Sequence, residues 1–117
     1  AALYPEVPMS DSHQVEVPPS FIQLYSAPGG RRLLQPADHV RERYELCEDL
    51  ANMLTTQATA RLHDLGVTEL DVLEKMEQGL AQEGSPVTPA EAWWVARRLA
   101  ELLNWPMPAG DPPASGD

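Results

Sequence analysis

The clearest helix signals in this chain of 117 residues lie in one segment, TPAEAWWVARRLAELLNWP, which runs from Thr88 to Pro106. Thr88 and Glu91 have the spacing of a capping box, in which each side chain bonds to the other residue's backbone N–H. Pro89 suits the first helical position, and Pro106 stops the helix because the residue before a proline disfavours helical backbone angles. The segment therefore predicts a helix over residues 89–104.

Two tryptophans of this predicted helix lie off its apolar stripe. The stripe is centred on Leu99 and contains alanine and aliphatic residues at helical spacing. Trp93 and Trp94 fall on opposite sides of the face turned away from this stripe, where they flank Arg97 and Glu101. Large aromatic side chains in such positions need cover, from the same chain or from another.

Three arrangements provide this cover, and the sequence leaves all of them open. In the first, the apolar cluster FIQLY at residues 21–25 folds back over one tryptophan. The second is a symmetric homodimer, and the third is a docking surface for a different protein, since Trp, Tyr and Arg are common energetic anchors. These arrangements can coexist. The candidate partner-binding residues are therefore Trp93, Trp94, Arg97, Glu101, Phe21, Ile22, Leu24 and Tyr25.

A proline-free region covers residues 37–85 and permits long helices, because proline breaks the helical hydrogen-bond pattern. Its apolar residues predict a long helix over residues 36–65, with Pro36 at the first helical position and Gly66 as a left-handed terminator. The apolar positions cover about half of the helix circumference, more than the usual stripe. Thr55 and two nearby threonines lower the helix propensity near the middle, where a bend or an end is the main alternative.

A second helix is predicted over residues 69–83. Thr68 is its N-terminal cap, and Asp71 stands three residues later, at the spacing of a capping box. Gly79 lowers the stability of the last turn by about 1 kcal/mol relative to alanine, and Gly84 closes the helix.

Prolines also mark the ends of the chain. Residues 1–17 are rich in proline and polar residues, which predicts a disordered or extended arm. Two prolines then open a short helical turn over residues 19–26, with Ser20 as its candidate cap, and a Pro-Gly-Gly turn follows at residues 28–30. The composition of residues 107–117 predicts a disordered tail.

These signals together predict an all-α protein. We expect a small three-helix bundle that forms a single domain over residues 18–106. An extended N-terminal arm carries the short helical turn. A domain of this size buries about two thirds of the surface of its unfolded chain, so we expect modest stability.

Charge and cysteine content argue against several classes of partner. The formal net charge of −10 leaves no surplus of Lys and Arg for nucleic-acid phosphates or an anionic membrane, and it opposes a DNA-binding helical domain. The sequence has neither the apolar run of a membrane span nor a secretory signal, which predicts a cytoplasmic protein. Its single cysteine, Cys47, forms no intrachain disulfide and falls among apolar positions, which predicts a buried, unreactive thiol.

One pattern offers an alternative chemistry. His39, Glu42, Glu45 and Asp49 follow one side of the first long helix and are candidate metal ligands or catalytic groups. A solvated acidic face explains the same pattern, because each helix of a bundle needs a polar side. The glycines and arginines of residues 28–32 do not make a phosphate-binding loop, since the lysine that such a loop requires is missing there.

The chain resembles a group of short proteobacterial helical proteins of uncertain role. The similar strings are VPPSFIQLY at 17–25, RYELCEDLA at 43–51, LGVTE at 65–69, DVLE at 71–74 and AELL at 100–103. Some members carry the label "ATPase with chaperone activity", which implies association with an ATPase or chaperone system. The label also implies a nucleotide site, but no phosphate loop is present and the only lysine is Lys75.

We therefore expect a noncatalytic interaction or regulatory protein of a bacterial cytoplasm. It would bind another protein or a second copy of itself through a helix face, with no cofactor and no nucleotide. The alternative is a small metal-binding or enzymatic domain that uses His39 and the acidic face beside it.

Overall fold

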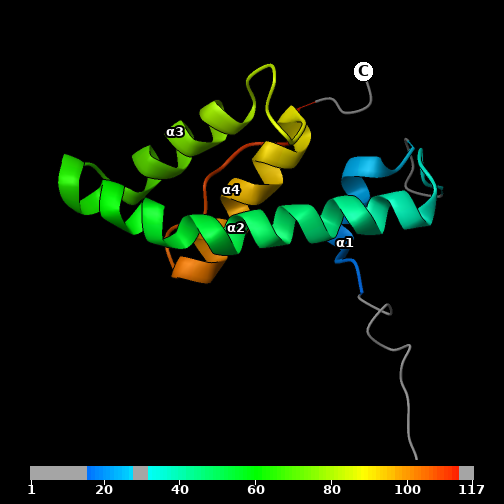
Figure 1. Cartoon of the computed structure of the whole chain (residues 1–117), viewed down its shortest axis with the longest axis horizontal. Helices are drawn as coiled ribbons and strands as arrows, with labels where there is room; N and C mark the ends of the chain where they lie inside the picture. Colours follow the sequence, from blue (N-terminus) through cyan, green and yellow to red (C-terminus); the bar gives the residue numbers. More distant parts are fainter. Residues whose placement is uncertain (1–15, 28–31, 114–117) are drawn as a thin grey trace, which may run out of the picture.

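The structure is a computed structural model that describes residues 16–27 and 32–113. Its elements are the helices α1 (Pro19–Ile22), η2 (Gln23–Tyr25, a 3-10 helix), α2 (Ala37–Leu65), α3 (Glu69–Leu80) and α4 (Pro89–Leu103). These residues contain no strand, so the predicted all-α bundle of three long helices is confirmed (Figure 1). Residues 1–15 of the predicted arm, the turn at 28–31 and residues 114–117 lie outside the described part of the chain.

The first long helix, α2, is continuous. It begins at Ala37, one residue later than predicted, because Pro36 has extended backbone angles (φ −58°, ψ 149°) and precedes the helix as its N-cap. It ends, as predicted, with Gly66 in the left-handed conformation (φ 64°). The hydroxyls of Thr55 and Thr59 donate to backbone carbonyls of the preceding turn, and the helix passes through both residues without interruption.

Helix α3 is shorter than predicted. Its capping box forms, with the Asp71 backbone N–H donating to Thr68 Oγ1 over 3.1 Å. The helix ends at Leu80 rather than at residue 83. The chain turns there because Leu80 and Ala81 pack against the core of the bundle, and Gly79 weakens the last helical turn.

Helix α4 agrees closely with its sequence signals. The predicted capping box between Thr88 and Glu91 is present, and Pro89 occupies the first helical position. Asn104 lies just beyond the last helical residue in a left-handed conformation (φ 59°), which asparagine tolerates better than most residues.

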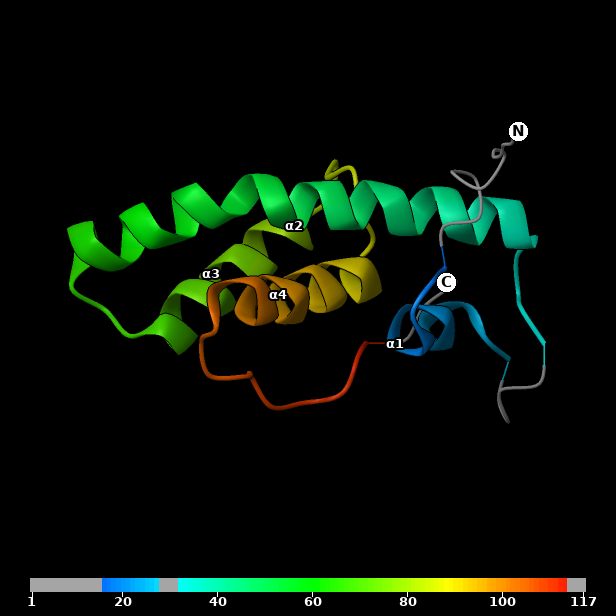
Figure 2. The same cartoon turned by 90° about the horizontal axis from the view of Figure 1, so that it is seen from below.

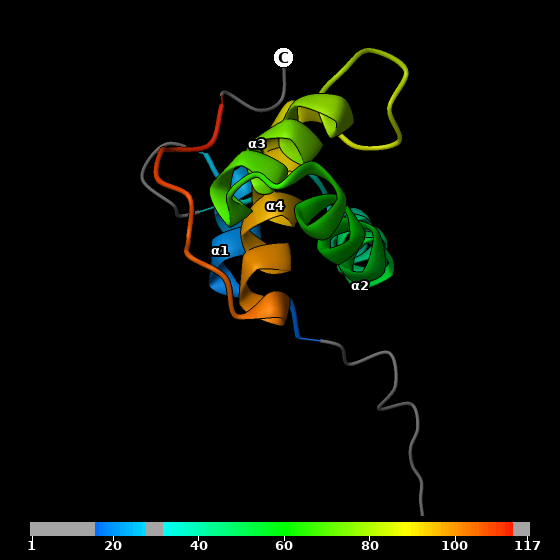
Figure 3. The same ribbon diagram turned by 90° about the vertical axis from the view of Figure 1, so that its left-hand side faces the viewer.

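Small side chains bring α4 close to its neighbours. α4 packs along both α2 and α3, and an end-on view shows these two helices and α1 on different sides of it (Figure 3). The buried small residues of α4 and α2 are Ala90, Ala92, Ala96, Ala100, Cys47, Ala51 and Ala58. Because such residues allow close approach of helix backbones, α4 contributes to both clusters of the core, one with α1 and one with α3.

The outer side of α2 remains exposed. Leu46, Met53 and Leu65 are among the apolar positions that we predicted to cover about half of the circumference of this helix as a buried surface, yet Met53 is 69% exposed and the other two are exposed as well. The prediction was wrong for these three residues because α3 and α4 cover only one side of α2.

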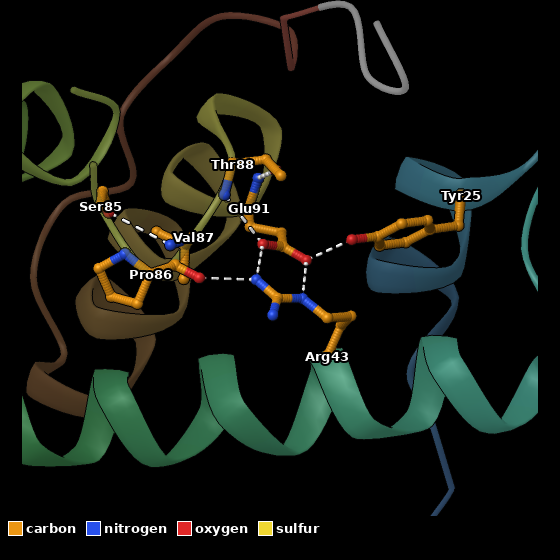
Figure 4. Close-up of polar contacts among 7 residues, drawn as sticks. All are labelled: Tyr25, Arg43, Ser85, Pro86, Val87, Thr88 and Glu91. Carbon is orange, nitrogen blue, oxygen red and sulfur yellow. Dashed lines mark hydrogen bonds and ion pairs between the residues drawn. The ribbon is translucent and has the colours of Figure 1, made fainter. Parts of the chain in front are cut away.

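A buried carboxylate joins three parts of the fold. Glu91 is fully buried, and it is the only charged residue in the buried class among those that the structure describes. Its carboxylate accepts hydrogen bonds from Arg43 Nη2 (2.6 Å) and Nε (2.9 Å), from the Thr88 backbone N–H (2.9 Å) and from the Tyr25 hydroxyl (Figure 4). Arg43 Nη2 also donates to the backbone carbonyl of Pro86. The network connects η2, α2 and the start of α4.

Hydrogen bonds within this network and burial together set the protonation states of Glu91 and Tyr25. Burial alone raises the pKa of Glu91, but hydrogen bonds from Arg43, Tyr25 and Thr88 outweigh it and the pKa lies below its usual value. Burial and the neighbouring Glu91 carboxylate raise the pKa of Tyr25, so its hydroxyl remains a donor. Near neutral pH the network is therefore a paired carboxylate and guanidinium with a protonated phenol.

Glu91→Gln should lower the free energy of unfolding by about 3 kcal/mol, because it leaves the guanidinium of Arg43 without its buried partner. Chemical denaturation at pH 7 measures this loss. Glu101→Gln is the matched control, since Glu101 pairs with Arg98 on the same helix but its side chain is 55% exposed. The control should cost less than about 1 kcal/mol. Equal effects of the two substitutions would contradict the assigned role of Glu91.

The stability of the protein should also depend on acid pH through Glu91. Its folded pKa is depressed, so its stabilisation is fully present above the unfolded value of about 4.3 and is lost as pH falls through the folded pKa. The difference in unfolding free energy between wild type and Glu91→Gln should therefore be largest above about pH 5 and shrink toward pH 2. Chemical denaturation of both proteins at several pH values across this range tests the prediction. A difference in unfolding free energy that does not change with pH would refute it.

Candidate functional site

An open groove of about 1000 Å³ lies over the outer face of α4. One side is lined by residues 16–20 and Ile22, and the other by Met107, Pro108 and Gly110 from the segment that follows α4. This segment has no helix or strand and doubles back beside α4 toward α1 (Figure 2). The groove therefore lies where both proline-rich ends of the described chain meet α4.

Trp93 lies in the groove with Arg97 stacked on its ring. The guanidinium carbon of Arg97 is 4.3 Å from the centre of the Trp93 ring, which is a cation–π contact. Arg97 Nη1 also pairs with Glu77 of α3 over 3.2 Å, so the guanidinium is held on two sides. Trp93 itself is only partly buried. The pair thus presents a fixed aromatic and cationic surface to the groove.

Trp94 has a different position. It is 4% exposed, its ring meets Phe21 edge-to-face with centroids 5.2 Å apart, and its Nε1 donates to Ser20 Oγ over 3.0 Å. The packing of the 21–25 cluster over a tryptophan is therefore confirmed for Trp94. The prediction that Ser20 caps the first helix was wrong, because no side chain caps α1 and the Ser20 hydroxyl bonds to the indole instead.

The predicted partner-binding residues fall into two groups. Trp93, Arg97, Glu101 and Ile22 line the groove, and Glu101 pairs with Arg98 on its edge. The remaining four predicted residues serve the interior. Phe21 and Leu24 are in the core, Trp94 is buried although it is among the residues that line the groove, and Tyr25 donates to Glu91.

The segment after α4 contributes groove residues that the sequence did not indicate. Residues 107–117 were predicted as a disordered tail, yet Met107, Pro108 and Gly110 line the groove and the Ala109 carbonyl accepts a hydrogen bond from Arg97. No periodic pattern reports where an irregular segment packs. One signal in the sequence was available. Trp93 and Arg97 lie off the core stripe, and their indole and guanidinium N–H groups need hydrogen-bond acceptors if another segment covers them.

The four candidate metal ligands of the alternative site do not converge in the part of the chain that the structure describes. His39, Glu42, Glu45 and Asp49 are all exposed on α2, and the His39 ring packs edge-to-face against Tyr25. Within the described residues no three His, Cys, Asp or Glu side chains come together as metal ligands. These four residues are a solvated face of α2, because successive members are spread along the helix instead of converging.

Cys47 has the environment of a core residue. It is fully buried between α2 and α4, and burial together with the charge of Glu91 raises the pKa of its thiol to about 12. At neutral pH the thiolate required of a nucleophile is therefore negligible.

Comparisons with protein-family models, with curated proteins and with solved structures find no match for this chain. Across the described residues, no helix combines the length and the apolar character needed to cross a membrane.

The burial of Cys47 predicts slow reaction with a thiol reagent such as dithionitrobenzoate. Native protein should react at least about 100-fold more slowly than unfolded protein, because the thiol becomes accessible only when the core opens. Met53→Cys is a suitable control, since Met53 is exposed on α2 and its replacement should add one rapidly reacting thiol. Rapid reaction of the wild-type protein would contradict the packing of α2 against α4.

Proposed function

We propose that this protein is a noncatalytic interaction module that binds another protein through the groove over α4. One observation carries the proposal: of two adjacent tryptophans, Trp94 is enclosed by the chain's own arm, whereas Trp93 remains partly exposed in a groove with Arg97 stacked on its ring. An indole and a guanidinium in a partly desolvated hollow are the side chains that most often anchor protein interfaces.

The groove is also organised in advance of binding. Arg97 is held by Glu77 from α3 and by the Trp93 ring, and its side chain is only 12% exposed. Side chains that are already ordered lose little conformational entropy when a partner arrives, which favours binding. The edge of the groove carries the Arg98 and Glu101 pair, typical of the polar rim around an interface.

The charge pattern of the groove favours a peptide over a phosphate group. Arg97 is paired with Glu77, and Arg98 is paired with both Glu48 and Glu101. Arginines that bind phosphate need free donors in a net positive environment, whereas these donors already serve carboxylates.

We further propose a bacterial cytoplasm as the compartment of this protein. From the sequence resemblance, we propose a component of an ATPase or chaperone system as its partner.

Affinity capture from cells of the source organism, followed by titration of each purified candidate, tests the proposal. Trp93→Ala should weaken binding of the true partner by about 10-fold or more, the usual effect of removing an interface anchor. Met53→Ala is the matched control, because Met53 is an exposed apolar residue on α2, away from the groove. Met53→Ala should bind the partner with the affinity of the wild-type protein.

The proposal is contradicted if every captured protein binds wild type and both variants equally. It is also contradicted if the only ligand that depends on Trp93 is a second copy of this chain, as judged by analytical ultracentrifugation. Thermal unfolding of each variant shows whether lost binding reflects a lost surface or a lost fold.

A further inference from the structure

The segment at residues 107–111, called the strap below, separates two hollows of the surface. The larger is the groove over α4, and the smaller, of about 400 Å³, is lined by Leu70, Glu74, Glu77 and Gln78 of α3. Trp93, Arg97, Pro108 and Gly110 line both hollows. The two hollows are therefore parts of one depression over α3 and α4, with strap residues in the lining of both. Figure 2 shows the backbone of this segment running back beside α4 toward α1.

The strap is held mainly through its backbone carbonyls. Arg97 Nη2 donates to the carbonyl of Ala109 over 2.7 Å, and Trp93 Nε1 donates to the carbonyl of Gly110 over 3.3 Å. Among the described residues, no backbone-to-backbone hydrogen bond holds the strap. Met107 is 50% exposed, and of the strap residues only Pro108 is partly buried. The strap is therefore held by two side-chain donors and by the partial burial of Pro108, which is weak for a structural element.

These contacts are those of a bound peptide. Four of the eight residues from 106 to 113 are proline, and proline-rich peptides bind aromatic grooves because little conformational entropy is lost when an already restricted chain is fixed. Trp93 donates its indole N–H to a strap carbonyl, and Trp93 and Pro108 line the same two hollows, which suits this kind of ligand. The strap thus shows which chemistry the depression accepts.

Charge indicates how another peptide would differ from the strap. Asp111 lines the smaller hollow together with Glu74, Glu77 and Arg97, and because Arg97 is paired with Glu77 the three carboxylates there outnumber the single guanidinium. Like charges in proximity disfavour the bound strap. A peptide with a basic residue at the position of Asp111 would replace this repulsion by attraction.

We propose that the depression over α3 and α4 binds an extended, proline-containing segment of a partner protein that carries a basic residue, and that the strap occupies this site until it is displaced. The inference rests on the proposed function and specifies the chemistry of its partner and the regulation of its site. A partner segment must compete with the strap, which is present at a high effective concentration because it belongs to the same chain.

Full-length Gly110→Ala tests the competition. Gly110 has φ 111°, which an alanine rarely adopts, although its Cβ would come no closer than 3.7 Å to Arg97. The substitution should loosen the strap without disturbing the core. Gly84→Ala is the matched control, because Gly84 also has a positive φ (90°) and open space, but it lies in the loop before α4, outside both hollows. Pro108→Gly loosens the strap by a second route.

The probes are two fluorescein-labelled peptides, one with the sequence of residues 105–113 (WPMPAGDPP) and one with lysine in place of aspartate (WPMPAGKPP). By fluorescence polarisation, Gly110→Ala and Pro108→Gly should bind the first peptide roughly 10-fold more tightly than wild type or Gly84→Ala. The lysine peptide should bind several-fold more tightly still. Adding Trp93→Ala to Gly110→Ala should remove binding, and the peptide should shift the Trp93 indole N–H resonance.

Three results would overturn the inference. The first is that neither peptide binds saturably to Gly110→Ala or Pro108→Gly and that the Trp93 indole N–H resonance does not shift. The second is that the peptides bind wild type, Gly84→Ala and Gly110→Ala with equal affinity. The third is dimerisation of the loosened variants with exchange of the strap, which would make a second copy the occupant. A different combination of results separates this inference from the proposed function. If a partner protein binds through Trp93 but neither peptide binds, the proposed function stands and only this inference is removed.

Discussion

The ion pair between the buried carboxylate of Glu91 and the partly buried guanidinium of Arg43 is the interaction on which the rest of the structure depends. It joins two long helices, and through the Tyr25 hydroxyl it also fixes the short N-terminal helices. A buried carboxylate without such partners would be strongly destabilising, so the three segments must come together for the fold to form. Glu91 also completes the capping box of α4, which means that one carboxylate sets both the start of the helix and its position.

The position of α4 decides the roles of its two tryptophans. With Glu91 directed at α2, the next turn places Trp94 against Phe21 and leaves Trp93 on the outer face. The segment from residue 16 to residue 25 thus completes the core through Phe21 and Leu24 and lines the groove through residues 16–20 and Ile22. Adjacent residues of the same type therefore belong to different parts of the molecule, one to its stability and one to its surface.

The groove combines a rigid floor with walls of irregular chain. Helix α4 holds Trp93 and Arg97 against one another, while the strap is bonded to them through two hydrogen bonds to its backbone carbonyls. Binding sites are commonly built in this way, because a rigid scaffold orients the contacts and a weakly held segment can exchange with a ligand. This division of roles motivates both the proposed interaction module and its displaceable strap.

The sequence by itself determined the helices and most of their ends. Capping boxes, helix-starting prolines and left-handed glycines act within a few residues, so Thr68, Thr88 and Gly66 could be assigned without knowledge of any neighbour. Only the tertiary structure decided that Glu91 is buried, that Ser20 bonds to Trp94 rather than to a helix end, and that the strap crosses the groove. Arg43 and Glu91 are separated by 48 residues and Ser20 and Trp94 by 74. Helical periodicity reports which side of one helix is apolar, whereas these contacts depend on how separate helices are placed against one another.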